Sequence, residues 1–192
     1  MPAAASARLA AVGALVAASG ALAVGGAGTA AAEPMPRGRI SGQVGLKAAT
    51  GGFASRLGLG WAVGVEAAYQ PLRADQSIGY ALSWSTTWSF YGDGSARVSD
   101  ALAMLELGAG IRARVPLGVR RRQVLFLGGG AALIRANEPP LIGGDRSYVG
   151  PWATAGLEGV LFGFQLGLEA RYVVIGTDDG TIGLLLSVGI GS

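Results

Sequence analysis

The stretch GFQLGLEARYVVIG, residues 163–176, decides the fold because its apolar and polar residues alternate. The even positions 164–174 are all apolar, whereas the odd positions 165–171 carry Gln165, Gly167, Glu169 and Arg171. Successive side chains of a β-strand point to opposite faces, whereas a helix would spread the two charges around its circumference. The stretch therefore predicts a strand with one apolar face and one polar face.

Eight segments follow this alternation, and clusters of Gly, Pro, Asp, Asn and Ser separate them. The segments lie near residues 39–48, 57–70, 77–91, 101–115, 122–136, 148–160, 164–174 and 181–191. No helical periodicity occurs between them. Evenly spaced strands of this kind predict an all-β fold, an antiparallel up-and-down meander that closes into an eight-stranded barrel.

The composition excludes several classes of function. The 192 residues are 51% hydrophobic and 14% charged, with 34 glycines and a net charge of +3. This charge is too small and too dispersed for a nucleic-acid surface. The chain has no cysteine and no histidine, so it lacks thiolate chemistry, the commonest general base and the commonest metal ligand. We expect no enzyme activity, no cofactor and no bound metal.

Residues 1–32 have the composition of a secretory signal peptide. Arg8 is the only charged residue in an Ala, Gly, Val and Leu tract that ends in three alanines, Ala30 to Ala32. The alternative is an anchoring helix, because the tract is longer than the apolar core of about 7–15 residues that signal peptides usually have. Beyond residue 32 no stretch reaches the roughly 18 uninterrupted apolar residues of a membrane helix. We expect a signal peptide at 1–32, a short periplasmic lead-in at 33–37 and a barrel at 38–192.

The alternation alone does not tell which face meets lipid, but three features do. The polar face is rich in Gly, Ala, Ser and Thr, which suit the crowded interior of a small barrel better than an exposed surface. Short connections at 70–75, 116–120 and 162–163 alternate with longer ones at 48–56, 91–100 and 136–147, as in outer-membrane barrels with both termini in the periplasm. Aromatic residues of the apolar face fall near strand ends and predict two membrane-interface girdles: Trp61, Tyr69, Tyr80, Trp88, Phe90, Phe126, Phe164 and Tyr172.

The polar face then points into a lumen that holds a set of charges. These are Lys47, Glu66, Glu106, Arg112, Arg114, Arg135, Glu158, Glu169 and Arg171. In the ambiguous segment 122–136, inward Gln123 and Arg135 would leave Val124, Phe126, Ala132 and Ile134 on the lipid side. An eight-stranded barrel is just wide enough for side chains to fill. We therefore expect a structural ion-pair network rather than a conduction path.

Over nearly all of residues 38–191 the chain resembles the small outer-membrane barrels of the OmpA and OmpX type, through its alternation and its girdles. The resemblance implies a Gram-negative outer membrane, lipid as the surrounding partner and a structural or surface-interaction role, with any protein partner unidentified. Such barrels usually end in an aromatic residue, whereas this chain ends in Gly191-Ser192. The alternatives are a narrow pore for small solutes and a soluble ligand-binding barrel.

Three further chemical possibilities are weak. Outer-membrane barrel families that are enzymes, such as lipid A deacylases, use an active-site histidine, and here a serine nucleophile would depend on Lys47, the only lysine. The stretch GAGIRA at 108–113 fits a dinucleotide fingerprint, but Pro116 follows where a helix is required. The TDDG stretch at 177–180 offers the carboxylates of Asp178 and Asp179, which in a short turn are more often turn residues than cation ligands.

The leader gives the first prediction. The mature protein is expected to start at Glu33, directly after the small-residue site. The intact mass of protein purified from outer membranes should lack residues 1–32. A mass that retains them would identify the leader as an anchor.

Overall fold

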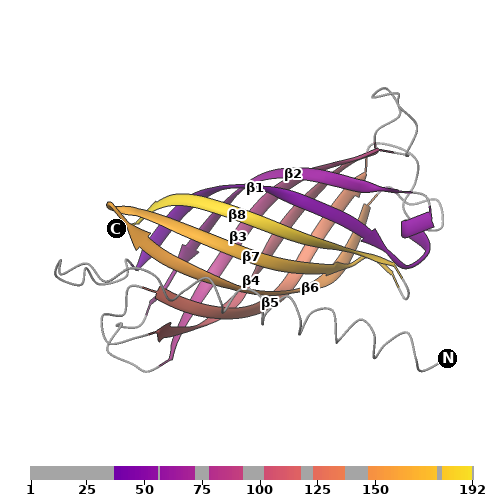
Figure 1. The fold of residues 1–192 in the computed structure, drawn as a ribbon. Coiled ribbons are helices and arrows are strands. Elements are labelled where there is room, and N and C mark those ends of the chain that lie inside the picture. Colours follow the sequence, from indigo (N-terminus) through magenta and orange to yellow (C-terminus); the bar gives the residue numbers. More distant parts are fainter. Residues whose placement is uncertain are drawn as a thin grey trace.

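The computed structural model is a closed barrel in which each of eight antiparallel strands pairs with the next and the last pairs with the first (Figure 1). The structure describes residues 37–55, 57–71, 78–92, 102–117, 123–136, 147–176 and 179–191, so the leader and Asp178 lie outside the described residues. The expected all-β, eight-stranded antiparallel fold is confirmed. Its elements are β1 (Gly38–Thr50), the 3₁₀ helix η2 (Gly51–Ser55), β2 (Leu59–Tyr69), β3 (Gly79–Tyr91), β4 (Leu102–Leu117), β5 (Gln123–Ala136), β6 (Ser147–Leu161), β7 (Phe164–Val174) and β8 (Gly180–Gly191).

The register of the strands fixes the width of the barrel. Following backbone partners once around the sheet from Gly38 returns the path to β1 at Ala48, ten residues further along the strand; the path runs through Tyr69, Leu82, Ile111, Gly129, Ala153, Tyr172 and Ile182. A stagger of this size inclines the strands to the barrel axis, typically by about 35–45°. With eight strands, the interior has room for side chains but not for a wide aqueous channel.

The two ends of the barrel differ in their connections. The first residues of β1 pair with the last residues of β8, so the start of the first strand and the end of the last strand lie at the same end of the barrel. The same end carries the connections 70–78, 118–122 and the two-residue turn 162–163, and the opposite end carries 51–58, 92–101, 137–146 and 175–179. The expected difference in length holds only in part: 118–122 and 162–163 are shorter than 51–58, 92–101 and 137–146, but 175–179 at the opposite end is as short as 118–122. It fails for the β2–β3 connection, which is longer than expected because β3 begins only at Gly79.

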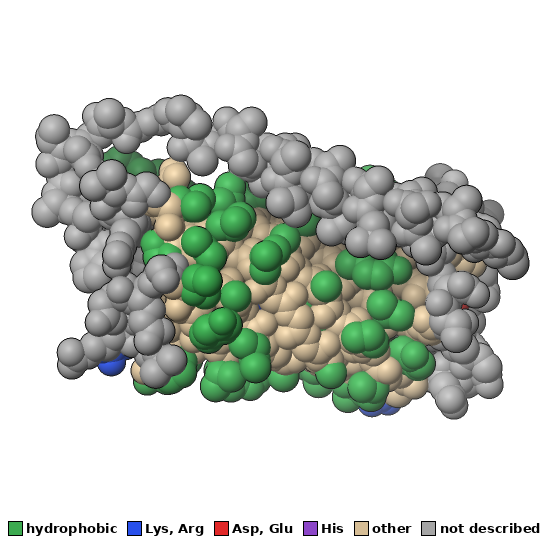
Figure 2. All heavy atoms as spheres, turned by 90° about the horizontal axis from the view of Figure 1, so that it is seen from below, with side chains coloured by type: hydrophobic (Ala, Val, Ile, Leu, Met, Phe, Trp, Pro, Cys, Tyr) green, Lys and Arg blue, Asp and Glu red, His purple; other side chains and the backbone are tan. Residues whose placement is uncertain are grey.

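Large apolar side chains cover the outside of the sheet. Exposed examples occur on every strand, among them Val44, Trp84, Ile111, Leu127 and Leu186. Figure 2 shows one such face, where hydrophobic side chains spread over the sheet and basic side chains are visible only toward its ends. Within the described part of the chain, no helix is both long and apolar enough to span a membrane. An outer face of this kind suits contact with lipid rather than water.

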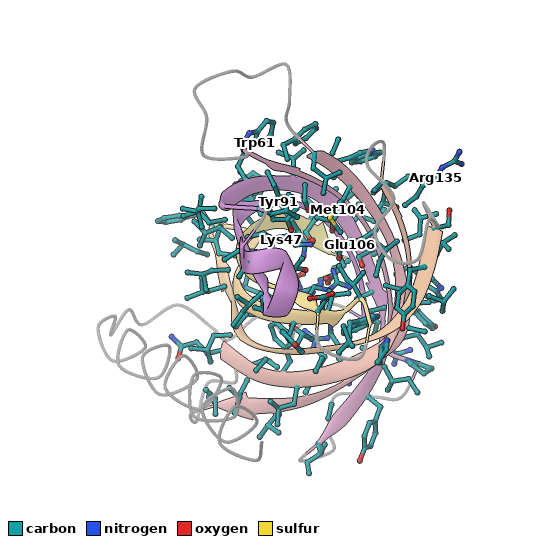
Figure 3. All side chains as sticks on the ribbon, turned by 90° about the vertical axis from the view of Figure 1, so that its right-hand side faces the viewer. Lys47, Trp61, Tyr91, Met104, Glu106 and Arg135 are labelled. Atoms are coloured by element: carbon teal, nitrogen blue, oxygen red, sulfur yellow. The ribbon has the colours of Figure 1, made fainter. Side chains whose placement is uncertain are left out.

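The expected orientation of β5 is wrong. Gln123 and Arg135 point outward and are exposed, whereas Val124, Phe126, Ala132 and Ile134 are buried inside the barrel. Figure 3 shows Arg135 directed away from the barrel. Both faces of this strand are apolar, so in the sequence its two polar residues were the only indication of which face points inward. Both of them lie at or next to a strand end, where an outward side chain can reach water at the edge of the lipid.

The orientation of β5 gives the second prediction. Leu127→Arg puts a charge on the lipid face and should reduce the free energy of unfolding by up to about 2–4 kcal/mol, the range for a charge near the midplane. Arg135→Leu on the same face should be nearly silent. Urea titrations of barrels refolded into phospholipid vesicles measure both. If Arg135→Leu reduced the free energy of unfolding by several kcal/mol, Arg135 would have to point into the lumen.

Candidate functional site

Among the residues that the structure describes, nine charged side chains lie in the lumen, none of them more than 8% exposed: Arg39, Lys47, Glu66, Glu106, Arg112, Arg114, Glu158, Glu169 and Arg171. The structure thus places eight of the nine predicted residues inside the barrel and replaces Arg135 with Arg39. Arg39 could have been found from the sequence, because it continues the inward series of Ser41 and Gln43 by one step toward the N-terminus.

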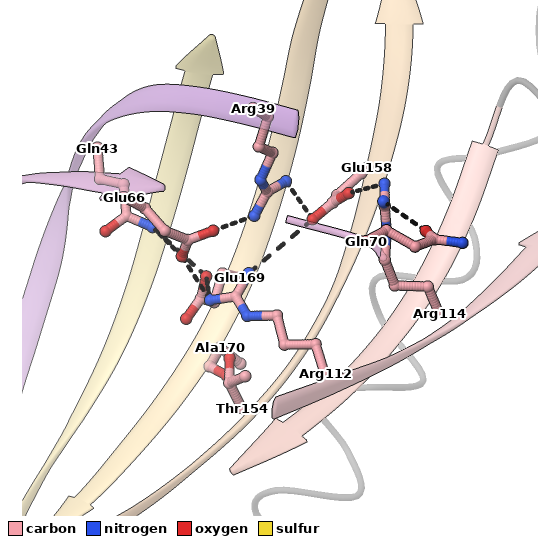
Figure 4. A network of polar contacts seen from close by, with 10 residues as sticks. All are labelled: Arg39, Gln43, Glu66, Gln70, Arg112, Arg114, Thr154, Glu158, Glu169 and Ala170. Atoms are coloured by element: carbon pink, nitrogen blue, oxygen red, sulfur yellow. Dashed lines mark hydrogen bonds and ion pairs between the residues drawn. The ribbon is translucent and has the colours of Figure 1, made fainter. Parts of the chain in front are cut away.

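Arg112 of β4 is the centre of this network (Figure 4). Its Nη2 donates to Glu66 Oε2 and to Glu169 Oε2, the latter at 2.9 Å. Its Nη1 lies 3.9 Å from Glu158 Oε1. These three carboxylates come from β2, β7 and β6. One guanidinium therefore ties four strands together across the lumen.

Arg39 and Arg114 extend the network toward the end where β1 begins. Arg39 forms ion pairs with both Glu66 and Glu158. Arg114 pairs with Glu158 at 2.9 Å and donates to Gln70 Oε1 at 3.0 Å. Each of these carboxylates therefore faces more than one guanidinium. Shared contacts of this kind suit the planar, multi-donor geometry of arginine.

Toward the opposite end, the lumen holds a separate ion pair between Lys47 of β1 and Glu106 of β4 (Figure 3). Arg171 lies between the two groups: its Nη2 donates to Ser85 Oγ at 2.7 Å, and its guanidinium stacks over Trp152 at 4.6 Å. Among the described residues no ion pair to Arg171 is found. A buried cation over an aromatic face is stabilised electrostatically by the ring.

Glycines of the lumen face give room to these large side chains. A methyl group built at Gly128 would lie 2.7 Å from Cγ of Arg112, and one at Gly183 would lie 2.9 Å from Cγ of Lys47. A methyl group at Gly110 would lie only 2.5 Å from the ring of Trp152. At these three glycines, side chains from other strands occupy the space that a larger residue would take.

Apolar side chains cluster in the part of the lumen near the β3–β4 connection. Tyr91, Leu102, Met104, Ile134, Val173 and Ile175 form a buried cluster there with Ala49, Ala132, Ala136 and Trp152. We call this region the apolar half of the lumen and the region around Arg112 the ionic half; the Lys47–Glu106 pair lies where the two meet, and the apolar half also holds the buried hydroxyls of Ser89 and Thr181. The sequence contains little sign of this cluster, since its members come from six strands or their immediate flanks, including only the inner face of the ambiguous β5.

Most of the expected girdle aromatics lie on the outside. Trp61, Tyr69, Tyr80, Trp88 and Phe164 are exposed, and Phe90 and Tyr172 are partly exposed. The rings of Trp61 and Phe90 stack with centroids 4.5 Å apart. Phe126 is the exception, because its ring lies inside the barrel, 4.7 Å from the guanidinium of Arg112.

Comparison with known structures identifies the architecture. Neisserial surface protein A is similar over 83% of this chain and all of its own, with a TM-score of 0.57 and 19% identity. The attachment invasion locus protein Ail of Yersinia pestis has a TM-score of 0.51 and 15% identity over 80% of this chain and 97% of its own. The chain has the fold of the small eight-stranded outer-membrane barrels.

The outer membrane enzyme PagL shares this fold, with a TM-score of 0.50 and 16% identity over 80% of this chain and 99% of its own. The fold alone is therefore compatible with catalysis as well as with other roles. No protein-family model matches the chain, and no curated protein sequence matches it. Within the described residues of this barrel, no cluster of three or more acidic side chains could hold a metal ion.

The central position of Arg112 gives the third prediction. Arg112→Ala leaves three buried carboxylates with one cationic partner fewer, and removing one partner of a buried pair typically costs roughly 3–5 kcal/mol. The variant should unfold at a clearly lower urea concentration than the wild type in the same vesicles. Arg135→Ala, which removes an equal charge from the outer face, is the matched control and should change little. Equal, small effects of both substitutions would mean that water already screens the lumen charges.

Proposed function

We propose that this protein is a bacterial outer-membrane barrel with a closed lumen, and that its role is structural or in contacts at the cell surface rather than in transport. The observation that carries this proposal is the burial of all nine lumen charges, each 8% exposed or less. A water-filled pore would expose such side chains to solvent. Here they face one another instead, and large side chains from neighbouring strands occupy the space over the glycines.

The apolar cluster supports the same proposal independently. An ion that travelled along the axis would meet the ionic half and then a region lined by Leu102, Met104, Ile134, Val173 and Ile175. Packed side chains leave little room for a hydrated ion, so the ionic half opposes ion flow by direct pairing and the apolar half opposes it by close packing.

The outer face and the leader support a place in the outer membrane. The outward apolar side chains fit lipid, and the Ala30 to Ala32 site fits export through a cleaved signal peptide. Two structures of the same fold are named as a surface protein and as an attachment invasion locus protein. In this barrel a surface role would belong to the connections 51–58, 92–101, 137–146 and 175–179, which share the end opposite the β1 and β8 termini.

A non-catalytic role is part of the proposal. PagL is named as an enzyme, but this chain contains no histidine and no cysteine. Its single lysine, Lys47, is buried in an ion pair with Glu106. The lysine on which a serine nucleophile would depend is thus paired and shielded from any substrate.

Recording in planar lipid bilayers tests the closed lumen and gives the fourth prediction. The purified barrel, checked for folding by the shift in its gel mobility on boiling, should give no steady conductance. Steady, ion-selective conductance that changes in Arg112→Gln or Glu106→Gln, but not in the outward control Arg135→Gln, would instead establish the narrow pore. Recovery of the protein in the soluble fraction of cells would support the soluble ligand-binding barrel.

A further inference from the structure

The turn between β6 and β7 carries an unusual residue. It consists of Phe162 and Gly163, both with positive φ, 52° and 81°. Two-residue hairpin turns of this kind favour Asn-Gly or Asp-Gly, because a side chain with a Cβ is disfavoured at positive φ. Phe162 is the only residue other than glycine with positive φ in the described part of the chain. Turn geometry alone therefore does not account for a phenylalanine here.

The ring of Phe162 projects from the barrel. It is 91% exposed, and the residues that flank the turn, Leu161 and Phe164, are 51% and 52% exposed. Leu161 and Phe164 are backbone partners that close the hairpin directly at the turn. Because the connection has only two residues, Phe162 cannot fold back over the barrel mouth. Three large apolar side chains thus form a tip at the barrel end where β1 begins.

This tip is continuous with the lipid-facing surface. Leu161 and Phe164 end the outward rows of β6 and β7, and Leu166 continues the row on β7. Phe162 extends the apolar surface by one residue beyond the sheet. If water surrounded the turn, Phe162 would be unfavourable for two reasons: its backbone has a positive φ, and its apolar ring is exposed to water. Contact with lipid removes the second of these costs.

We propose that the tip formed by Leu161, Phe162 and Phe164 inserts into the head-group region of the periplasmic leaflet and anchors this end of the barrel. The proposal rests on the outer-membrane placement proposed above. The occupant is the phospholipid interface, since the tip continues a surface that already faces lipid. Aromatic rings are favoured at this depth because the interface accepts their apolar body while the adjacent turn backbone stays hydrated.

Site-directed spin labelling tests this inference, and the absence of cysteine makes single labels straightforward. Nitroxides are attached to Phe162→Cys, to Leu186→Cys on the outward face of β8 and to Ala54→Cys on η2, each in phosphatidylethanolamine–phosphatidylglycerol vesicles. Accessibility to oxygen relative to a water-soluble nickel chelate reports depth. The label at 162 should lie between the lipid reference at 186 and the aqueous reference at 54. Accessibility at 162 equal to that at 54 would overturn the proposal.

A second pair of variants keeps the test valid if Phe162→Cys refolds poorly. A label at Leu161→Cys reports the depth of the same corner with the native ring in place. Combining this label with Phe162→Asn removes the ring and introduces a residue that tolerates positive φ. The label at 161 should then shift toward water. No shift would contradict anchoring by the ring. Dipolar broadening between labels on different molecules would show that a second copy covers the tip, which also overturns the proposal.

The reference label at Leu186 distinguishes a failure of anchoring by the turn from a failure of the membrane placement. If the label at 186 is lipid-exposed and the label at 162 is aqueous, only the anchoring role of the turn fails. If both labels are aqueous, the membrane placement itself fails.

Discussion

The closed hydrogen-bond ladder is the constraint on which the rest of this structure depends. Inside a bilayer no water is present to satisfy backbone N–H and C=O groups, so a sheet must have no free edge. The pairing of β1 with β8 removes that edge. Closure with eight strands and a stagger of ten residues then fixes a narrow interior. Everything that points inward has to fit this width, and in the proposed membrane location everything that points outward has to suit lipid.

The narrow interior explains why glycines and arginines occur together on the inner face. A guanidinium can cross to carboxylates on other strands only if the positions beneath it are small, as Gly128 is beneath Arg112. The charges in turn compensate one another's loss of hydration, which would be prohibitive for isolated ions. Arg112, with partners on β2, β6 and β7, fixes the relative positions of strands that are not neighbours of its own strand. The network thus adds cross-lumen links to a sheet whose hydrogen bonds run only between adjacent strands.

The two halves of the lumen differ in what they require of the chain. The ionic half depends on the geometry of a few donors and acceptors, whereas the apolar half depends on close packing around Met104, Ile134 and Val173. Arg171 lies at the boundary, bonded to Ser85 on one side and stacked on Trp152 on the other. Its aromatic partner belongs to the apolar cluster. A change of volume at this boundary would therefore affect both halves.

The sequence by itself determined the number of strands, their antiparallel order and the inward face of most of them, because a period of two places every second side chain on the same face. Glu169 and Arg171 were placed in the lumen on that ground. The same alternation also places Arg39 inside, in series with Ser41 and Gln43. Tertiary structure decided two things. It turned Arg135 outward and Phe126 inward, since β5 is apolar on both faces and the local pattern carries no preference there. It also selected which carboxylate each arginine meets. Those partners lie up to 119 residues apart along the chain, as Arg39 and Glu158 do, and the stagger of the closed sheet, which no single segment encodes, brings them together.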